Sequence, residues 1–419
     1  MCHFCRTFDS FCGLQFKGEA RDEGVAFKED EAMIRIKDMT RCCGCTACQA
    51  VCPHDAISMR QDALGFKYPE VAEDRCTDCG LCEKACDFQK MISEAETCNV
   101  PDAGIDVLAV RHNDAEVLKG SQSGGVFTAL SDIVLSEGGV IYGAAIDQDF
   151  KVVHCRAESS KERDAFRGSK YVQSDMGVIF RDVRNDLKEG RTVMFTGTPC
   201  QVAGLSSFIP SSLRNKLILI DFVCHGVPSP RVWSDYVSYR QKKGTIVKAD
   251  FRDKDAGWKI HKESFVYEDG QKRFYETYKV LFYKNIMLRH SCGVCPYDIS
   301  HRKADVTIAD FWGVGDLLPE FDSAGGVSMV IPHTAEGKSL VKKSLTSLDS
   351  LAVTLTKEFM SLRNPNLLRS SRIYHERMEF ERLYPEKGFI YAAKRWGDLG
   401  WRYKAWQLKV FIRKILGSK

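Results

Sequence analysis

Short apolar runs alternate with amphipathic segments along most of the chain after residue 104. Apolar runs of about four to eight residues are typical of buried strands, whereas apolar residues at helical spacing predict helices. Strands are predicted at 105–112, 140–147, 151–157, 192–196, 217–223, 304–313 and 325–334, and helices after Gly125, over 176–190, after Gly197 and over 231–242. This alternation predicts an α/β body with a largely parallel sheet, interrupted by antiparallel strands between 245 and 278.

The first hundred residues carry a dense pattern of cysteines instead. Two runs share the spacing C-x2-C-x2-C-x3-C, namely Cys42, Cys45, Cys48 and Cys52, then Cys76, Cys79, Cys82 and Cys86. In tandem runs of this kind three thiolates hold one 4Fe–4S cluster and the fourth holds the other. The expected ligand sets are therefore Cys42, Cys45 and Cys48 with Cys86, and Cys76, Cys79 and Cys82 with Cys52. Zinc, the alternative, prefers two C-x2-C pairs separated by a dozen or more residues.

Residues 34–92 resemble the bacterial two-cluster ferredoxins. The segment MIRIKD at 33–38 is predicted to form a short strand, and Cys43, which is offset from the ligand spacing, is predicted to be a packed thiol. Residues 1–32 are polar and aperiodic, so we expect a disordered extension, with Met33 as an alternative start. A metal site on Cys2, Cys5 and Cys12 is the alternative there, although these three lack a fourth ligand.

Four further cysteines are predicted to come together in the body. Cys200 follows the strand at 192–196, and Cys224 follows the strand at 217–223. The carboxyl ends of parallel strands meet at one edge of a sheet, where ligand sites form. Cys292 and Cys295 add a C-x2-C pair, so these thiolates are predicted to form a third metal site. Their spacing leaves iron and zinc both open, and four separate buried cysteines are the alternative.

Composition narrows the class of protein. The chain has 419 residues, 18 cysteines and a net charge of +4 from 60 basic and 56 acidic residues. Charge this balanced favours neither nucleic acid nor a strongly acidic substrate. No apolar run reaches the roughly 20 residues of a membrane-spanning helix, and the first residues lack the pattern of a signal peptide. We therefore expect a cytoplasmic protein whose cysteines bind metal, without a nucleic-acid partner.

One glycine-rich turn is a candidate anion site. SQSGG at 121–125 precedes a predicted helix, whose first amides and dipole suit an anion such as the pyrophosphate of a flavin. A plain turn before a helix is the alternative. The chain has no P-loop and no G-x-G-x-x-G after a strand. A flavin would also join clusters that carry one electron to organic chemistry that needs two.

Six motifs in order make the body resemble the beta subunits of coenzyme F-420 hydrogenases and dehydrogenases. They are SQSGGVFTAL, FRGSKYVQSD, GTPCQVAGL, the segment around Cys224, CGVC and ADVTIADFWG, and the resemblance spans about residues 105–335. It implies FAD on the α/β domain and a 4Fe–4S cluster on Cys200, Cys224, Cys292 and Cys295. It implies that the flavin is lined by Ser123, Gly124, Gly125, Thr128, Gly168, Ser169, Lys170, Tyr171 and Thr198. Some members of the family use the deazaflavin coenzyme F-420, and some are thought to belong to gene clusters for cell-surface polysaccharides.

Candidate proton donors and the C-terminal tail complete the picture. His225 and Asp310 are candidate proton donors near the flavin, or equally satisfied structural groups. The tail at 388–419 mixes tryptophans with lysines and arginines. This mixture predicts either contact with an anionic surface, such as the inner face of a membrane, or a helix docked on the body.

The sequence thus predicts an α+β protein with a disordered extension at 1–32, a two-cluster ferredoxin domain at 33–100, a flavin and iron–sulfur body at 105–335, and a C-terminal segment at 336–419. We expect an oxidoreductase with three 4Fe–4S clusters and FAD that acts on an unidentified substrate. The alternative is an electron-transfer subunit without its own substrate that docks to a hydrogenase, a dehydrogenase or a glycan enzyme. Both hypotheses require a redox partner protein, such as a ferredoxin or a hydrogenase subunit. The third hypothesis is a scaffold or sensor that carries clusters but no flavin.

Overall fold

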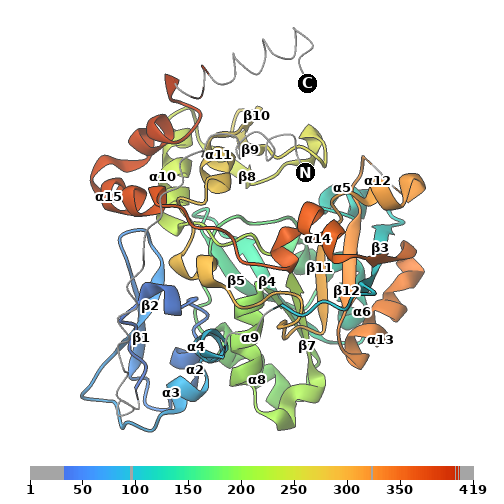
Figure 1. Cartoon of the computed structure of the whole chain (residues 1–419), viewed down its shortest axis with the longest axis horizontal. Helices are drawn as coiled ribbons and strands as arrows, with labels where there is room; N and C mark the ends of the chain where they lie inside the picture. The colour runs from blue at the N-terminus through green and yellow to red at the C-terminus, as the bar shows by residue number, and fades with distance from the viewer. Residues whose placement is uncertain (1–32, 95–97, 322–323, 402, 404, 406–419) are drawn as a thin grey trace.

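A mixed sheet of eight strands forms the centre of the molecule (Figure 1). The computed structural model describes residues 33–94, 98–321, 324–401, 403 and 405. The strand order is β13-β3-β12-β11-β7-β6-β4-β5. The strands are β3 (Ile105–His112), β4 (Val140–Ile146), β5 (Val152–Ala157), β6 (Val193–Gly197), β7 (Leu217–Phe222), β11 (Val306–Asp310), β12 (Ser328–Pro332) and β13 (Leu348–Leu355). Only the four central strands, β11, β7, β6 and β4, pair in parallel, and antiparallel strands flank them on both sides.

Helices cover both faces of this sheet. One face carries α6 (Val126–Ser136) and α13 (Ala335–Ser344), and the other carries α8 (Ile179–Lys188), α9 (Pro199–Phe208) and α14 (Lys357–Arg363). Short helices at the strand ends are α5 (Ala115–Gly120), α7 (Ser160–Arg163) and α12 (Val314–Leu317). Val193 and Phe195 of β6 face α8 and α9, whereas Met194 between them faces α6. Burial on both faces explains why β6 and β7 each begin with an apolar run, Val193–Phe195 and Leu217–Ile220.

The cysteine-rich domain packs against the α9 side of the sheet. It contains α2 (Ala47–Val51), α3 (Leu81–Lys84), α4 (Asp87–Ser93) and an antiparallel hairpin of β1 (Ile57–Gln61) and β2 (Lys67–Val71). The tip of the hairpin is anchored on the body, because Ser229 Oγ donates to the carbonyl of Leu64 at 2.6 Å. The strand predicted at 33–38 is wrong: the segment pairs with no strand, and the Ile34 amide donates to a sulfur, Cys82 Sγ, instead.

A second, smaller sheet lies beyond the carboxyl ends of the central strands. Its strands β8 (Ile246–Asp250), β9 (Glu263–Tyr267) and β10 (Lys272–Tyr275) are antiparallel, as the pattern between 245 and 278 predicts. Helices α10 (Pro230–Gln241), α11 (Thr277–Tyr283) and α15 (Glu376–Arg395) pack with it around a core rich in aromatic residues, including Trp233, Phe265 and Tyr278. This unit forms one wall of the site described below.

The end of the chain differs from expectation in one respect. Strand β13 pairs with β3 along its whole length, so the central sheet continues past the boundary predicted at residue 335. The predicted extension at 1–32 and residues 406–419 of the tail lie outside the described residues.

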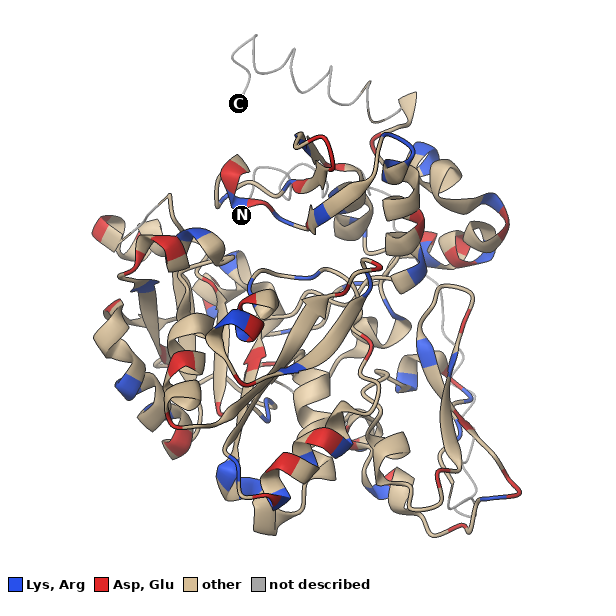
Figure 2. Cartoon of the chain, turned by 180° about the vertical axis from the view of Figure 1, so that it is seen from behind, with Lys and Arg blue, Asp and Glu red and all other residues tan. Residues whose placement is uncertain are grey.

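None of the helices in the described part of the chain is long and apolar enough to span a bilayer. Acidic and basic residues intermingle on the outer helices (Figure 2).

Candidate iron–sulfur and flavin sites

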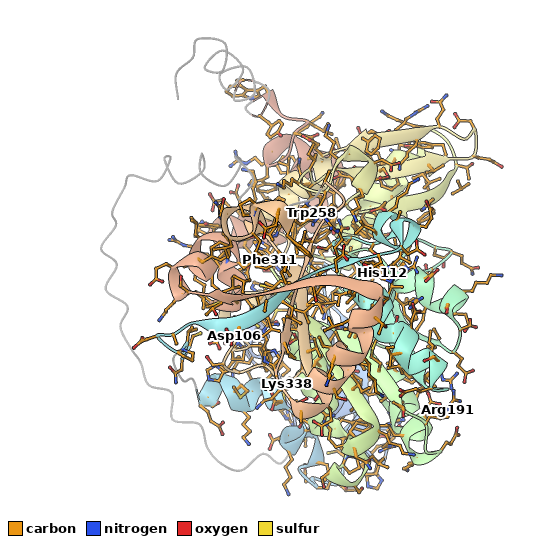
Figure 3. All side chains as sticks on the ribbon, turned by 90° about the vertical axis from the view of Figure 1, so that its right-hand side faces the viewer. Asp106, His112, Arg191, Trp258, Phe311 and Lys338 are labelled. Carbon is orange, nitrogen blue, oxygen red and sulfur yellow. The ribbon has the colours of Figure 1, made fainter. Side chains whose placement is uncertain are left out.

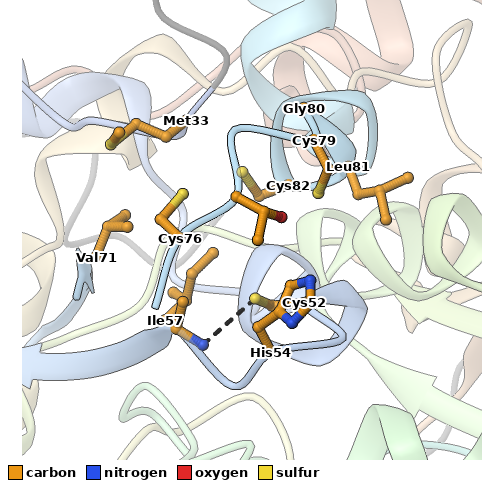
Figure 4. A pocket seen from close by; sticks show the side chains of 12 residues that line it. Met33, Cys52, His54, Ile57, Val71, Cys76, Cys79, Gly80, Leu81 and Cys82 are labelled. Carbon is orange, nitrogen blue, oxygen red and sulfur yellow. Dashed lines mark hydrogen bonds between the residues drawn. The ribbon is translucent and has the colours of Figure 1, made fainter. Parts of the chain in front are cut away.

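Cys52, Cys76, Cys79 and Cys82, here called the distal set, line one cavity (Figure 4). The loop that carries three of them turns around the cavity through left-handed backbone at Asp78 and Gly80, with φ of 49° and 69°. Two amides point at the sulfurs: Ile34 N donates to Cys82 and Ala56 N donates to Cys52, each at 3.4 Å. Such amide-to-sulfur bonds orient the ligands of a cluster and tune its potential. Cys79 is exposed, so this set lies at the open edge of the domain.

Cys42, Cys45, Cys48 and Cys86, the proximal set, line a second cavity. Left-handed backbone at Gly44 and Thr46 wraps this loop in the same way, with φ of 72° and 71°. The set lies deeper than the distal one, and burial raises the pKa of the Cys86 thiol to about 12. Ligand thiols with raised pKa values must lose their protons when metal binds, so cluster assembly here releases protons. The structure therefore groups both tandem runs in the crossed sets that their spacing predicts.

Cys200, Cys224, Cys292 and Cys295, the body set, meet at the carboxyl ends of β6 and β7. These two strands are parallel neighbours. The pair Cys292 and Cys295 comes from a 3-10 turn, η6 (His290–Val294), and from the residue that follows it. Burial raises the pKa of Cys224, and the thiols of Cys292, Cys200 and Cys295 raise it further, so the four lie close enough to interact.

The chemistry around the body set suits a cluster. The Val227 amide donates to Cys292 Sγ at 3.3 Å, and the Thr198 hydroxyl lies 3.2 Å from Cys200 Sγ. A lone zinc ion would need four sulfurs within about 2.3 Å of one point. Among the described residues, no group of three or more Cys, His, Asp or Glu side chains is placed to hold a single ion. The metal that the body set binds stays a prediction.

The proximal and body sets adjoin each other across the domain boundary. Cys43 is buried between them, and its side chain contacts those of Cys45 and Cys200. Cys45 also packs against Gly204 of α9. A Cβ at Gly204 would lie 2.6 Å from Cys45 Sγ, so no larger residue fits at this position. Cys43 is thus a packed thiol, at the one place where the two sets come together.

The beginning of α6 gathers buried polar groups without partners. Nε2 of His112, Nε2 of Gln122, Oγ1 of Thr128 and Nε of Arg167 have no hydrogen-bond partner within the described part of the chain. His112 ends β3 beside this turn (Figure 3), and because its Nδ1 accepts from the Asp114 amide, its Nε2 carries the proton. All four groups can therefore donate. Each costs about 1–3 kcal/mol if left unsatisfied, so this position fits a ligand rich in acceptors, such as the phosphates of FAD.

The two glycines of the turn have a structural reason as well. A Cβ at Gly124 would lie 2.2 Å from the Val110 carbonyl oxygen and 2.5 Å from the Ser328 amide nitrogen, and Gly125 has a φ of +85°. Gly124 is therefore required by close packing on β3 and β12. A valine there would displace the strands before it met a cofactor, and Gly124→Val is not a selective test of flavin binding.

Lys254 brings a positive charge to the same turn. Its Nζ donates to the carbonyls of Ser123, at 2.9 Å, and Leu118. Burial lowers the pKa of Lys254 to about 8. The hydroxyl of Ser123 donates to the Val327 carbonyl at 2.6 Å, so it helps to shape the turn and is already satisfied.

The segment GSKY at 168–171 forms the next part of the wall. Lys170 folds back on its own loop and donates to the carbonyls of Ala165 and Arg167, and burial lowers its pKa to about 7. The ring of Tyr171 lies 4.8 Å from that of His261 and 5.0 Å from that of Phe282. Gly168 has a φ of +78°, which fits its place in the turn.

His225 links this aromatic wall to the body set. It follows Cys224 in the chain, and its ring lies 5.0 Å from Phe282. Its Nε2 lies 2.7 Å from Asn285 Oδ1, and burial lowers its pKa. A neutral, buried imidazole whose nitrogens already have amide partners is arranged as a structural group, and its role as a proton donor stays a prediction.

Asp310 is held in a buried ion pair. Arg252 Nη1 donates to Oδ2 at 2.5 Å, and Trp258 Nε1 donates to Oδ1 at 3.0 Å. Trp312 stacks on Trp258 with centroids 5.3 Å apart, and Arg252 lies 4.9 Å above Trp312. Both carboxylate oxygens of Asp310 accept hydrogen bonds, so this residue compensates the charge of the buried Arg252. Its role as a proton donor stays a prediction.

Replacing Asp310 by asparagine should destabilise the protein by about 3 kcal/mol, because it leaves the buried Arg252 without a counter-charge. The matched control is Asp316→Asn, which breaks the ion pair between Asp316 and Arg363. The Asp316 side chain is 52% exposed, so this substitution should lower the free energy of unfolding by at most about 1 kcal/mol. Thermal unfolding of the iron-loaded proteins measures both. Unchanged stability of Asp310→Asn would contradict the structural role and favour the proton-donor role instead.

Three residues of these sites escaped sequence reasoning: His112, Arg167 and Lys254. Arg167 alone had a signal, because it directly precedes Gly168 in the motif FRGSKY. The others are isolated in the sequence and gain their meaning only from the fold.

Two family models match separate parts of the chain. Residues 41–90 match the 4Fe-4S dicluster domain, and residues 190–353 match the family of the C terminus of the coenzyme F420 hydrogenase/dehydrogenase beta subunit. The chain is 23% identical over 188 residues to the F subunit of the F(420)H(2) dehydrogenase of Methanosarcina mazei, which covers 43% of this chain and 51% of that protein. Over 57 residues it is 40% identical to the B subunit of the Na(+)-translocating ferredoxin:NAD(+) oxidoreductase complex of Acetobacterium woodii, which is 13% of this chain and 16% of that one.

A solved structure is similar as well. The F420-reducing [NiFe] hydrogenase complex of Methanosarcina barkeri contains a chain with 19% identity and a TM-score of 0.46, which covers 64% of this chain and 90% of that one. The present chain spans about half the length of the dehydrogenase subunit that it matches. It carries, in order, a 4Fe-4S dicluster domain and the C-terminal region typical of coenzyme F420 hydrogenase/dehydrogenase beta subunits, and is thus related to iron–sulfur electron-transfer oxidoreductase subunits.

Proposed function

We propose that this chain is an iron–sulfur flavoprotein that exchanges electrons between a redox partner protein and FAD, with a hydride-level step on a substrate that is not yet identified. The observation that carries the proposal is the succession of three four-thiolate sets, of which the outermost is open at Cys79 and the innermost adjoins the aromatic wall at His225. When bound, the clusters would supply one-electron transfer, and the flavin would convert between one-electron and two-electron chemistry.

The residues of the chain support each part of this assignment. The distal set leaves a sulfur at the surface, where a partner protein can approach. Cys43 and the packing of Cys45 on α9 exclude water from the boundary between the proximal and body sets. The donors at the beginning of α6 would hold the phosphates of FAD, and Tyr171, His261 and Phe282 would pack against its ring system.

Comparison with larger enzymes supports the partner. The dehydrogenase of Methanosarcina mazei and the oxidoreductase complex of Acetobacterium woodii contribute relatives that are, by their names, subunits. A second hypothesis therefore stays in view, in which the chain is an electron-transfer subunit without its own substrate. The use of coenzyme F-420, the role in polysaccharide synthesis and the membrane contact through the tail remain predictions.

The test is reduction of the flavin by a protein donor. Iron-loaded protein reconstituted with FAD is mixed anaerobically with reduced ferredoxin, and bleaching of the flavin absorbance is followed. Wild type should be reduced, and Cys79→Ser, which alters the exposed ligand of the distal set, should slow the reduction at least about tenfold while FAD stays bound. If fully iron-loaded protein binds neither FAD nor FMN, the scaffold or sensor hypothesis replaces the proposal. If the reduced flavin is reoxidised only by another protein, the subunit hypothesis is favoured.

A further inference from the structure

Arg289 is a fully buried arginine that joins the body to the cysteine-rich domain. It lies three residues before Cys292, and its side chain crosses the boundary and donates through Nε to the Cys42 carbonyl at 2.7 Å. Its Nη2 donates to the carbonyl of Lys67 at 2.9 Å and lies 3.5 Å from Cys42 Sγ. The guanidinium also lies 4.1 Å from the ring centre of Tyr68. Every edge of the group is thus fixed in place.

The charge of Arg289 has no carboxylate partner within the described part of the chain. Its other hydrogen-bond partner is the neutral amide of Gln173, at 2.9 Å. The groups whose charge acts on its pKa, opposing the effect of burial, are Cys42, Tyr68, Cys43 and Cys292. A buried cation without an anion costs several kcal/mol, and proteins rarely tolerate it. A bound iron–sulfur cluster would supply this anion, because the negative charge of its four thiolates exceeds the positive charge of its core.

We propose that Arg289 is a positioning residue that raises the reduction potential of the cluster held by the proximal set. The inference rests on the proposed function, because it requires a cluster there. One-electron reduction of a bound cluster by the redox partner protein would make and break no bond, and it would increase the negative charge beside a fixed guanidinium. A fixed positive charge and an N–H group directed at a ligand sulfur both favour the reduced state. Among the described side chains that hydrogen-bond across the two domains, Arg289 donates to a sulfur of this set.

A second arginine provides the matched control. Arg181 of α8 also fastens the cysteine-rich domain to the body, through the carbonyls of Gln49, Ala50 and Cys52. It forms an ion pair with Asp55 at 2.7 Å and is 31% exposed. Its charge is therefore compensated and partly screened, and it donates to carbonyl oxygens rather than to a sulfur. Both arginines hold the domain in place, but only Arg289 should affect the potential.

The experiment is a redox titration of the iron-loaded protein followed by electron paramagnetic resonance, in which Cys48→Ser identifies the signal of the proximal cluster. Arg289→Gln should lower its midpoint potential by about 59 mV, a tenfold change for a one-electron couple. Arg289→Lys, which keeps the charge but loses the planar fork, should lower it less, and Arg181→Gln should leave it unchanged. Iron content verifies that each variant is assembled.

The outcomes separate the inference from the proposed function. An unchanged potential in Arg289→Gln, or equal shifts in Arg289→Gln and Arg181→Gln, would overturn the role of Arg289. If Arg289→Gln does not assemble its clusters, Arg289→Met, which removes the charge and keeps an unbranched side chain, takes its place: a lowered potential supports the inference, and a wild-type potential overturns it. A wild-type protein without any proximal signal would instead contradict the proposed function.

Discussion

Replacing Cys224 by serine is expected to remove about four of roughly twelve irons from the anaerobically purified protein and to leave both clusters of the cysteine-rich domain intact. Cys224 follows β7 and lies close enough to the other three cysteines of the body set to affect their charge interactions, so its loss should open that set alone. The distal and proximal sets take all eight of their sulfurs from residues 42–86 and depend on no residue of the body set.

Cys224 is a better choice for this experiment than Cys200. Cys43 contacts Cys200, so its thiol is close enough to replace the lost ligand in a Cys200→Ser protein and hide the effect. The matched control is Cys43→Ser, the same substitution at a buried cysteine outside every set, which should retain all twelve irons. Iron and zinc are measured together with the cluster signals. About eight irons with one zinc in the wild type would show that the body set holds zinc, and loss of iron from Cys43→Ser would make Cys43 a ligand.

Local spacing explains why the cysteine-rich domain could be predicted in such detail. Its two loops are built from neighbouring residues, and left-handed backbone at Gly44 and Gly80 lets each loop close around its cavity. The crossed grouping of the sets then follows from the position of Cys52 and Cys86 at the ends of short helices. The body set could be predicted for a different reason. Two apolar runs predicted adjacent parallel strands, and Cys200 and Cys224 follow these two strands.

Non-local packing explains what the sequence analysis missed. Strand β13 is half exposed and alternates irregularly, so its pairing with β3 has no strong pattern. The segment MIRIKD has strand-like composition, but the Ile34 amide donates to Cys82 Sγ, and no strand of the described residues pairs with this segment. Gly124 looks in the sequence like a residue that admits a cofactor, whereas its hydrogen faces the backbone of β3 and β12. No sequence pattern singles out Arg289, because the carbonyl to which it donates belongs to Cys42, 247 residues earlier in the chain.

Replacing Arg167 by glutamine is expected to weaken FAD binding at least about tenfold while the iron content stays at the wild-type level. Arg167 Nε is buried and unpartnered at the beginning of α6, near His112, Gln122 and Thr128. A charge-assisted hydrogen bond to a phosphate is worth about 1.5–3 kcal/mol, which corresponds to a factor of ten or more in affinity. The variant keeps an amide of similar shape and disturbs no strand, unlike a substitution at Gly124.

A second arginine makes the result specific. Arg184 Nε is likewise buried without a hydrogen-bond partner, but Arg184 lies on α8, over Phe208 on the opposite face of the sheet. Arg184→Gln should therefore bind FAD as the wild type does. Titration of the iron-loaded apoflavoproteins with FAD, followed by quenching of its fluorescence, measures all three affinities. Equal affinity in Arg167→Gln and wild type would move the flavin away from the beginning of α6. Equal losses in both variants would mean that the arginines act through the stability of the fold, because the two side chains share no site.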